Sequence, residues 1–168
     1  VEKHDDMIVI GDGGDIVATA AKILPVPREG AWMDPGPLGT LGVGMPFALA
    51  AQVSFPDKKV LIIYGDGSFG LNGFEYDTAI RFNLPIVGIV GNDAAWGQML
   101  RPQIGIYGKE RAVATYLRPT RYDKVVEALG GHGEYCERPE EIRPALERAF
   151  ASGKPALINV MIRRDETE

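Results

Sequence analysis

Hydrophobic residues along this chain form short continuous runs that alternate with longer stretches of helical spacing. A short continuous apolar run indicates a strand buried on both faces, and apolar positions three or four residues apart indicate an amphipathic helix. The runs predict strands at 7–11, 31–34, 59–65, 85–92, 132–137 and 155–162. The helical spacing predicts helices at 14–24, 40–54, 72–83, 121–130 and 138–152.

The alternation of strands and helices predicts one α/β domain over residues 1–168. Right-handed crossovers between parallel strands place helices on both faces, so we expect a three-layer α/β/α sandwich with a mainly parallel sheet. In such sheets ligands bind beyond the carboxyl ends of the strands. The stretch 97–120 shows no firm periodicity and is long for a loop. We expect it to be functional or to be ordered by something outside this chain.

Composition and charge are those of an ordinary globular protein. The chain has 168 residues, of which 45% are hydrophobic, and a net charge of −5. This acidic balance, without a basic and aromatic cluster, argues against a nucleic-acid partner. The longest apolar stretch, 41–53, is too short to span a membrane. The single cysteine, Cys136, cannot form an internal disulfide, so we expect a reducing, cytoplasmic compartment.

A Gly-Asp-Gly sequence at 65–67 follows the strongest predicted strand, and Asp93 follows the next strand, 27 residues after Asp66. A crossover of that length makes the two strand ends neighbours, and the small residues that begin the intervening helix suit a phosphate. Two carboxylates beside a phosphate repel it and each other. A Mg²⁺ ion resolves that conflict, because it is shared between carboxylates and substrate phosphates. The candidate ligands are Asp66, Asp93 and a backbone carbonyl near Ala95; the alternative is that both acids only cap helices and fill turns.

A second Gly-Asp-Gly sequence, at 11–13, follows the first predicted strand. Residues 37–41 after it hold no oxygen ligand at the matching place, and it lacks the G-x-G-x-x-G spacing of a dinucleotide-binding turn. We interpret residues 12–15 mainly as a strand-to-helix turn with an N-cap. A nucleotide-binding dehydrogenase domain built on this turn is the weaker alternative.

The sequence GDGSFGLNGFEYDTAIRFNLPIVGIVGND, at 65–93, resembles the signature of thiamine diphosphate-dependent enzymes. Upstream, DPGPLGTLGVGMPFALAAQ resembles the segment with which that family holds the aminopyrimidine ring. The stretches GNDAAWGQ and KPALINVMI are most similar to the acetolactate synthase-like branch, which includes 2-hydroxyacyl-CoA lyases and oxalyl-CoA decarboxylases. The resemblance covers nearly the whole chain. It implies the thiamine diphosphate-binding fold and matches one module of those enzymes, the C-terminal diphosphate-binding (PP) domain.

The resemblance implies a role for each matching residue at the metal end. Asp66 and Asp93, with the carbonyl of Ala95, would bind Mg²⁺, and Gly67 and Ser68 would donate to the diphosphate. The family usually has Asn where this chain has Asp93, so Asn92 is a competing ligand.

At the ring end, the resemblance implies that Leu41 is the catalytic wedge that bends the cofactor. The carbonyl of Gly39 and the N–H of Leu41 would bind the aminopyrimidine. The full set of implied cofactor-binding residues is Gly39, Thr40, Leu41, Gly65, Asp66, Gly67, Ser68, Asp93, Ala95, Trp96 and Gly97.

The family resemblance also implies an activity and partners. The activity is that of a C–C bond lyase or synthase on 2-hydroxyacyl-CoA or 2-oxo acid substrates, with thiamine diphosphate as the electron sink. The glutamate that such chemistry needs comes from a pyrimidine-binding domain of the same or a neighbouring chain, so we expect the isolated chain to be inactive. We expect the working enzyme to be a homo-oligomer, a dimer or tetramer. We interpret Glu75 as a helix-surface residue and 36–52 as an interface with that domain. The alternative is a non-catalytic α/β assembly module that retains the fold.

Three residues after the predicted metal turn have two open interpretations. In the first interpretation Trp96, Gln98 and Arg101 face the substrate. In the second, Trp96 packs on the sheet and Arg101 lies in solvent. Their place after the turn favours function slightly for Trp96 and Gln98.

Overall fold

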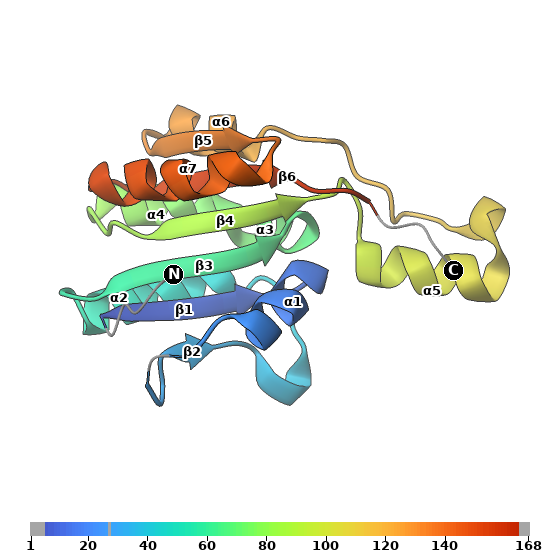
Figure 1. Ribbon diagram of the computed structural model, residues 1–168, viewed down its shortest axis with the longest axis horizontal. Helices are drawn as coiled ribbons and strands as arrows, with labels where there is room; N and C mark the ends of the chain where they lie inside the picture. Colours follow the sequence, from blue (N-terminus) through green and yellow to red (C-terminus); the bar gives the residue numbers. More distant parts are fainter. Residues whose placement is uncertain (1–5, 27, 165–168) are drawn as a thin grey trace.

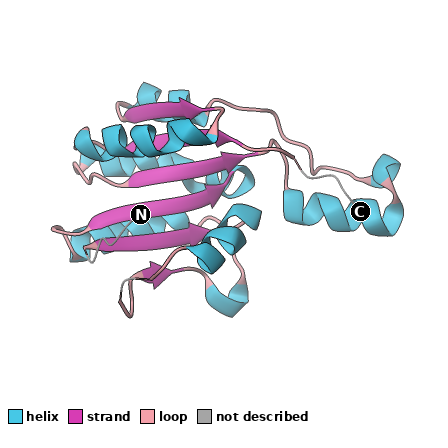
Figure 2. Cartoon of the chain, viewed as in Figure 1, coloured by secondary structure: helices cyan, strands magenta, loops and turns pink. Residues whose placement is uncertain are grey.

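The computed structural model describes residues 6–26 and 28–164, which form a six-stranded sheet with the order β2-β1-β3-β4-β6-β5 (Figure 1, Figure 2). Every paired strand runs parallel to its neighbour. Each predicted strand is present within a residue or a few of its expected bounds. The strands are β1 (Met7–Asp12), β2 (Trp32–Met33), β3 (Lys59–Gly65), β4 (Val87–Asn92), β5 (His132–Cys136) and β6 (Ala156–Met161).

Helices cover both faces of the sheet, which confirms the three-layer α/β/α prediction. On one face the buried side chains of Met45, Tyr76 and Val126 pack with the sheet, and on the other Ala145 and Ala149 do so. The helices are α1 (Asp15–Ile23), α2 (Gly44–Ser54), α3 (Asp66–Asn72), α4 (Tyr76–Arg81), α5 (Gly97–Tyr107), α6 (Tyr122–Leu129) and α7 (Pro139–Ala151). Short 3₁₀ turns are η1 (Gly36–Leu38), η2 (Gly73–Glu75) and η3 (Lys109–Arg111). Across the described residues, no helix is long and apolar enough to cross a membrane.

The strand order changes direction between β1 and β3. From β1 the chain continues to β2 on one side, whereas β3 and then β4 lie on the other side. Asp12 at the end of β1 pairs with Tyr64, and Gly65 at the end of β3 pairs with Gly91 of β4. The carboxyl ends of these strands therefore meet at one edge, where open α/β sheets bind their ligands.

Two helix predictions differ from the structure. The helix expected at 72–83 begins earlier, at Asp66, and is divided into α3, η2 and α4. Glycine has no side chain and so adds nothing to a helical hydrophobic pattern. The first turns of this segment are rich in glycine, and the pattern therefore did not predict them as helix. The helix expected at 40–54 begins at Gly44, after an irregular loop at 39–43.

The stretch 97–120 is not a loop throughout. Its first half is α5, which extends beyond the carboxyl ends of the strands and away from the sheet (Figure 1). Only Leu100 and Ile104 of this helix are buried, so it carries too few apolar contacts to give a clear helical pattern. Its second half is ordered within the chain itself, because Tyr116 pairs with Ala95 in an antiparallel bridge.

The strand-to-helix turn predicted at 12–15 is present, because β1 ends at Asp12 and α1 begins at Asp15. Gly14 occupies the N-cap position of α1, and no side chain there bonds the first turn. Asp12 is the last residue of β1, and its carboxylate accepts from the backbone N–H groups of Gly42 and Gly44.

Candidate functional site

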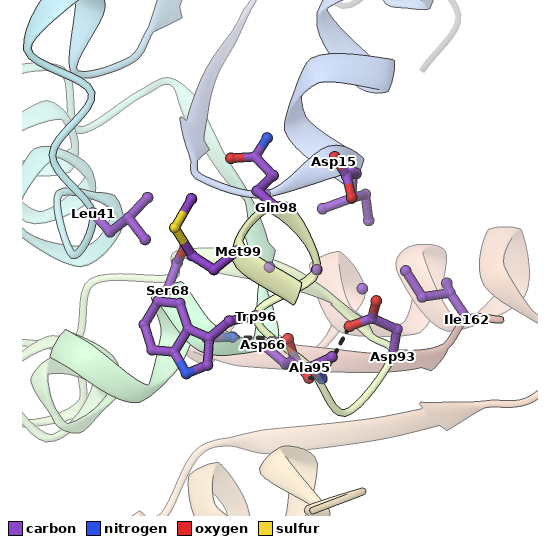
Figure 3. Close-up of a pocket in the computed structure, with 16 residues that line it drawn as sticks. Asp15, Leu41, Asp66, Ser68, Asp93, Ala95, Trp96, Gln98, Met99 and Ile162 are labelled. Atoms are coloured by element: carbon purple, nitrogen blue, oxygen red, sulfur yellow. Dashed lines mark hydrogen bonds between the residues drawn. The ribbon is translucent and has the colours of Figure 1, made fainter. Parts of the chain in front are cut away.

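A pocket lies beyond the carboxyl ends of β1, β3 and β4 and encloses about 530 Å³ of empty space, part of which opens to solvent (Figure 3). Its walls come from segments far apart in the sequence. The lining residues are Gly14, Asp15, Ile16, Leu41, Gly65, Asp66, Gly67, Ser68, Gly91, Asp93, Ala95, Trp96, Gly97, Gln98, Met99 and Ile162. The pocket thus occupies the sheet edge at which the sequence places a ligand.

Two carboxylates share one backbone donor in this pocket. The N–H of Ala95 lies 3.2 Å from Oδ2 of Asp66 and 3.2 Å from Oδ1 of Asp93 (Figure 3). Asp66 begins α3 and is 2% exposed, and its other oxygen accepts from the N–H of Gly67 at 2.8 Å. The ends of β3 and β4 therefore bring together the two acids that the sequence singles out.

The surroundings of these acids disfavour two negative charges. Burial and then the charge of Asp93 raise the pKa of Asp66 to about 6. Burial also raises the pKa of Asp93, against the opposing effect of the Ala95 N–H and of Arg164. Within 6–26 and 28–164 no three His, Cys, Asp or Glu side chains gather as a metal-binding group. A cation would therefore combine these two carboxylates with backbone or ligand oxygens, a donor set that suits Mg²⁺.

The turn that carries Asp93 is fixed from two sides. Ala94 has a positive φ of 56°, a conformation that a non-glycine residue adopts only when its surroundings hold it. Arg164, just after β6, donates to the carbonyls of Asp93 at 2.9 Å and Ala94 at 3.0 Å. The N–H of Leu117 also donates to the Ala94 carbonyl, at 2.8 Å. The segment after α5 thus helps to hold the turn in place.

The side chain of Asn92, the competing ligand, is turned into the protein. It is fully buried, its oxygen accepts from the N–H of Ala94, and its NH₂ group donates to the carbonyl of Thr120 and to Asn159. Asn92 does not line the pocket, whereas Asp93 does. This arrangement favours Asp93 over Asn92 as the second side chain available to a metal ion.

Leu41 lies at the opposite end of the pocket from Asp93 (Figure 3). A Cβ atom on Gly13 would fall 2.1 Å from the Leu41 side chain and 2.4 Å from the Ser68 hydroxyl, so these three residues are in close contact. Gly39 and Thr40 are exposed and are not among the lining residues.

Trp96, Gln98 and Arg101 have different positions. A Cβ atom on Gly67 would lie 2.8 Å from the indole ring of Trp96, which therefore packs on the first turn of α3 while it also lines the pocket. Gln98 lines the pocket too. Arg101 is not simply solvated, because it forms an ion pair of 2.6 Å with Asp15.

Sequence reasoning missed one wall of the pocket. Gly14, Asp15 and Ile16 come from the first Gly-Asp-Gly segment, which we interpreted mainly as a turn. Gly91, Met99 and Ile162 were not singled out either. The signal that could have found the first group is topological: a strand adjacent to β3 ends in a similar glycine-rich turn at the same edge of a parallel sheet.

Three comparisons with known proteins agree on the type of domain. Residues 12–160 match the family model described as thiamine pyrophosphate enzyme, C-terminal TPP binding domain. The acetolactate synthase large subunit IlvG of Mycobacterium tuberculosis is 47% identical over 157 residues, which cover 93% of this chain and 28% of that protein. The human 2-hydroxyacyl-CoA lyase 2 is 38% identical over 167 residues, which cover 96% of this chain and 26% of that protein.

Among solved structures, a thiamine diphosphate-dependent 4-hydroxybenzoylformate decarboxylase from Rhodococcus jostii superposes with a TM-score of 0.86 at 26% identity. The match covers 98% of this chain and 31% of that one, and it confirms the predicted thiamine diphosphate-binding fold. The chain spans only about a quarter of the length of the curated relatives it matches. It belongs to the family of C-terminal TPP-binding domains of thiamine pyrophosphate enzymes.

Proposed function

We propose that this chain binds the Mg²⁺-diphosphate end of thiamine diphosphate through Asp66, Asp93 and the carbonyl of Ala95. The observation that carries the proposal is the pair of carboxylates on one N–H group, inside a pocket lined by glycines. A divalent cation cancels the repulsion of the two acids and supplies the charge that a diphosphate needs.

The remaining lining residues fit the two ends of such a ligand. Gly67 lines the pocket beside the acids, with the Trp96 indole packed where a side chain would lie, and the Ser68 hydroxyl adds a polar group. Leu41, at the other end, offers an apolar surface to the rings. Residues Gly65, Trp96 and Gly97 complete the wall around the ligand. The roles of Gly39 and Thr40 in binding the pyrimidine are carried over from the family resemblance.

We further propose that the chain acts as one module of a larger lyase or synthase on 2-hydroxyacyl-CoA or 2-oxo acid substrates. Its relatives support this, since they are named as acetolactate synthase and 2-hydroxyacyl-CoA lyase 2. When bound, thiamine diphosphate supplies the electron sink for C–C bond cleavage. This chain's part is to bind and orient the cofactor, while a pyrimidine-binding domain of the same or a neighbouring chain completes the site.

Calorimetric titration of the chain with thiamine diphosphate, with and without Mg²⁺, tests the metal site. Wild-type protein is expected to bind only with Mg²⁺. The Asp66→Asn variant removes a metal ligand, so its affinity should fall by at least about tenfold. Its stability without metal should not fall, because the substitution also removes the repulsion from Asp93.

The matched control is Asp77→Asn, which changes an exposed acid on α4 that forms an ion pair with Arg81 of the same helix. This variant should bind as the wild type does. Binding by wild type that is independent of Mg²⁺, or wild-type affinity in Asp66→Asn, would contradict the metal site. No binding by wild type, alone or with its partner domain, would favour the non-catalytic assembly module.

A further inference from the structure

Asp12 is a buried carboxylate that the proposed metal site does not use. It ends β1, is 1% exposed and does not line the pocket. Its Oδ1 accepts from the N–H of Gly42 at 2.9 Å, and its Oδ2 accepts from the N–H of Gly44 at 2.7 Å. Both oxygens therefore hold a segment that lies 30 and 32 residues away in the sequence.

Asp12 holds the 39–43 loop at Gly42 and the first residue of α2 at Gly44, and this loop carries Leu41 into the pocket. Gly42 has a φ of 85°, so the loop turns sharply directly after Leu41. From the other side, the side chain of Asn72 donates to the Gly42 carbonyl. The loop and the start of α2 are thus held through the Gly42 and Gly44 N–H groups, which donate to Asp12, and through the Gly42 carbonyl, which accepts from Asn72 at the end of α3.

Asp12 and Leu41 are also linked through the neighbouring residue. Gly13 follows Asp12 directly, and the Leu41 side chain lies where a Cβ atom on Gly13 would be. A Cβ atom on Gly44 would lie 2.8 Å from the Asp12 carboxylate, so the loop and the turn pack without a gap. Movement of the loop away from Asp12 would therefore draw Leu41 out of its contact with Gly13.

Charge explains why a carboxylate suits this position. Burial raises the pKa of Asp12, while the N–H groups of Gly42, Val43 and Gly44 stabilise its charged form. A carboxylate accepts on both oxygens. An Asn at the same position would turn an NH₂ donor toward one of these N–H groups, and that N–H would lose its acceptor.

We propose that Asp12 is a positioning residue, which holds the 39–43 loop so that Leu41 can contact the ring end of thiamine diphosphate. The inference rests on the proposed function. It assigns different roles to the two Gly-Asp-Gly sequences. Asp66 binds the metal, and Asp12 positions the loop at the opposite end of the pocket. Asp12 touches neither the cation nor the diphosphate.

Two ligands distinguish binding at the metal end of the pocket from binding at the Leu41 end. Inorganic pyrophosphate with Mg²⁺ needs only the metal end, whereas thiamine diphosphate with Mg²⁺ also needs the Leu41 end. In calorimetric titrations of the full chain, we expect Asp12→Asn to keep its pyrophosphate affinity within about twofold and to lose at least about tenfold for thiamine diphosphate. Hydrogen exchange at the Gly42 and Gly44 amides should become faster in this variant.

The matched control is Asp123→Asn, which alters an equally buried carboxylate on α6. It should lower stability without changing the ratio of the two affinities, which separates positioning from general destabilisation. The inference is overturned if Asp12→Asn keeps the wild-type ratio, or if wild type binds thiamine diphosphate no more tightly than pyrophosphate. Absence of Mg²⁺-dependent pyrophosphate binding in wild type would instead be the failure of the proposed function.

Discussion

Arg101 balances a third carboxylate at the mouth of the pocket. It pairs with Asp15 at 2.6 Å, and Asp15 and Asp93 both have an oxygen 3.3 Å from the point where a Cβ of Gly97 would lie. A cation at Asp66 and Asp93 would not cancel the charge of Asp15. In Arg101→Gln this charge would face a diphosphate, so Mg²⁺-pyrophosphate affinity should fall several-fold in a titration at low salt. The loss should shrink at high salt, because exposed charges are screened.

A double substitution separates charge from packing at this residue. Asp15→Asn/Arg101→Gln removes both charges and should regain most of the wild-type affinity, and Asp15→Asn alone should bind at least as well as wild type. If the double variant binds as weakly as Arg101→Gln, then Arg101 acts by holding α5 and not by its charge.

At the residue scale, the sequence predicted which side chains lie close together only where the partners are joined by one crossover. Asp66 and Asp93 each follow directly after one of two consecutive strands, so their spacing was enough to predict that they are neighbours. The contacts of Asp12 with Gly44 and of Asp15 with Arg101 were not predicted. These partners lie far along the chain, and no sequence pattern links them to the first turn. Such pairings depend on the order of strands in the sheet, which the sequence does not display.

At the scale of elements, regular burial decided what could be predicted. The four long strands are buried almost throughout and appear as apolar runs. In contrast, α5 buries only Leu100 and Ile104 and contains Pro102 in its interior, so its pattern is weak. The first residues of α3, Asp66, Gly67 and Ser68, line the pocket and include no large apolar side chain, so they give no helical pattern.

Asp123 joins α6 to the sheet, and we expect its loss to destabilise the whole domain. It is 1% exposed, accepts from Arg121 at 2.9 and 2.6 Å, and accepts from Asn159 of β6 at 3.3 Å. Asp123→Asn leaves the buried Asn159 and the more exposed Arg121 without a charged acceptor, which should lower the free energy of unfolding by about 1–3 kcal/mol at pH 7. Urea unfolding measures this difference.

The pH dependence of that difference has a definite sign. Burial raises the pKa of Asp123, but the hydrogen bonds from Arg121 and Asn159 outweigh it and leave the pKa below its ordinary value of 3.8. Because the folded pKa is lowered, the stabilisation is present above pH 3.8 and is lost as the pH falls below it. The difference in the free energy of unfolding between wild type and Asp123→Asn should therefore become smaller in acid. A difference that grows as the pH falls would mean that Asp123 is not charged in the folded protein.

At the scale of the whole molecule, two large apolar side chains close in sequence to pocket-lining segments are not covered by the domain itself. Leu38, next to the 39–43 loop, is 89% exposed, and Phe74, just after α3, is 76% exposed. Large exposed apolar residues of this kind are typical of interaction surfaces when they gather beside a site. The chain spans only about a quarter of its relatives, so a pyrimidine-binding domain is the partner we propose for this edge.

Leu38→Asp should weaken that partner's binding and leave Mg²⁺-pyrophosphate binding unchanged, because Leu38 does not line the pocket. Burying a charge in an apolar interface is costly, so the dissociation constant in sedimentation velocity should rise at least about tenfold. Val53→Asp is the control, since Val53 is 67% exposed near the end of α2, the helix that begins at the pocket edge and leads back toward the start of β3. Equal effects of the two variants would mean that the partner does not dock at the pocket edge. An effect of Leu38→Asp alone would place the domain that completes the site directly over the loop that carries Leu41.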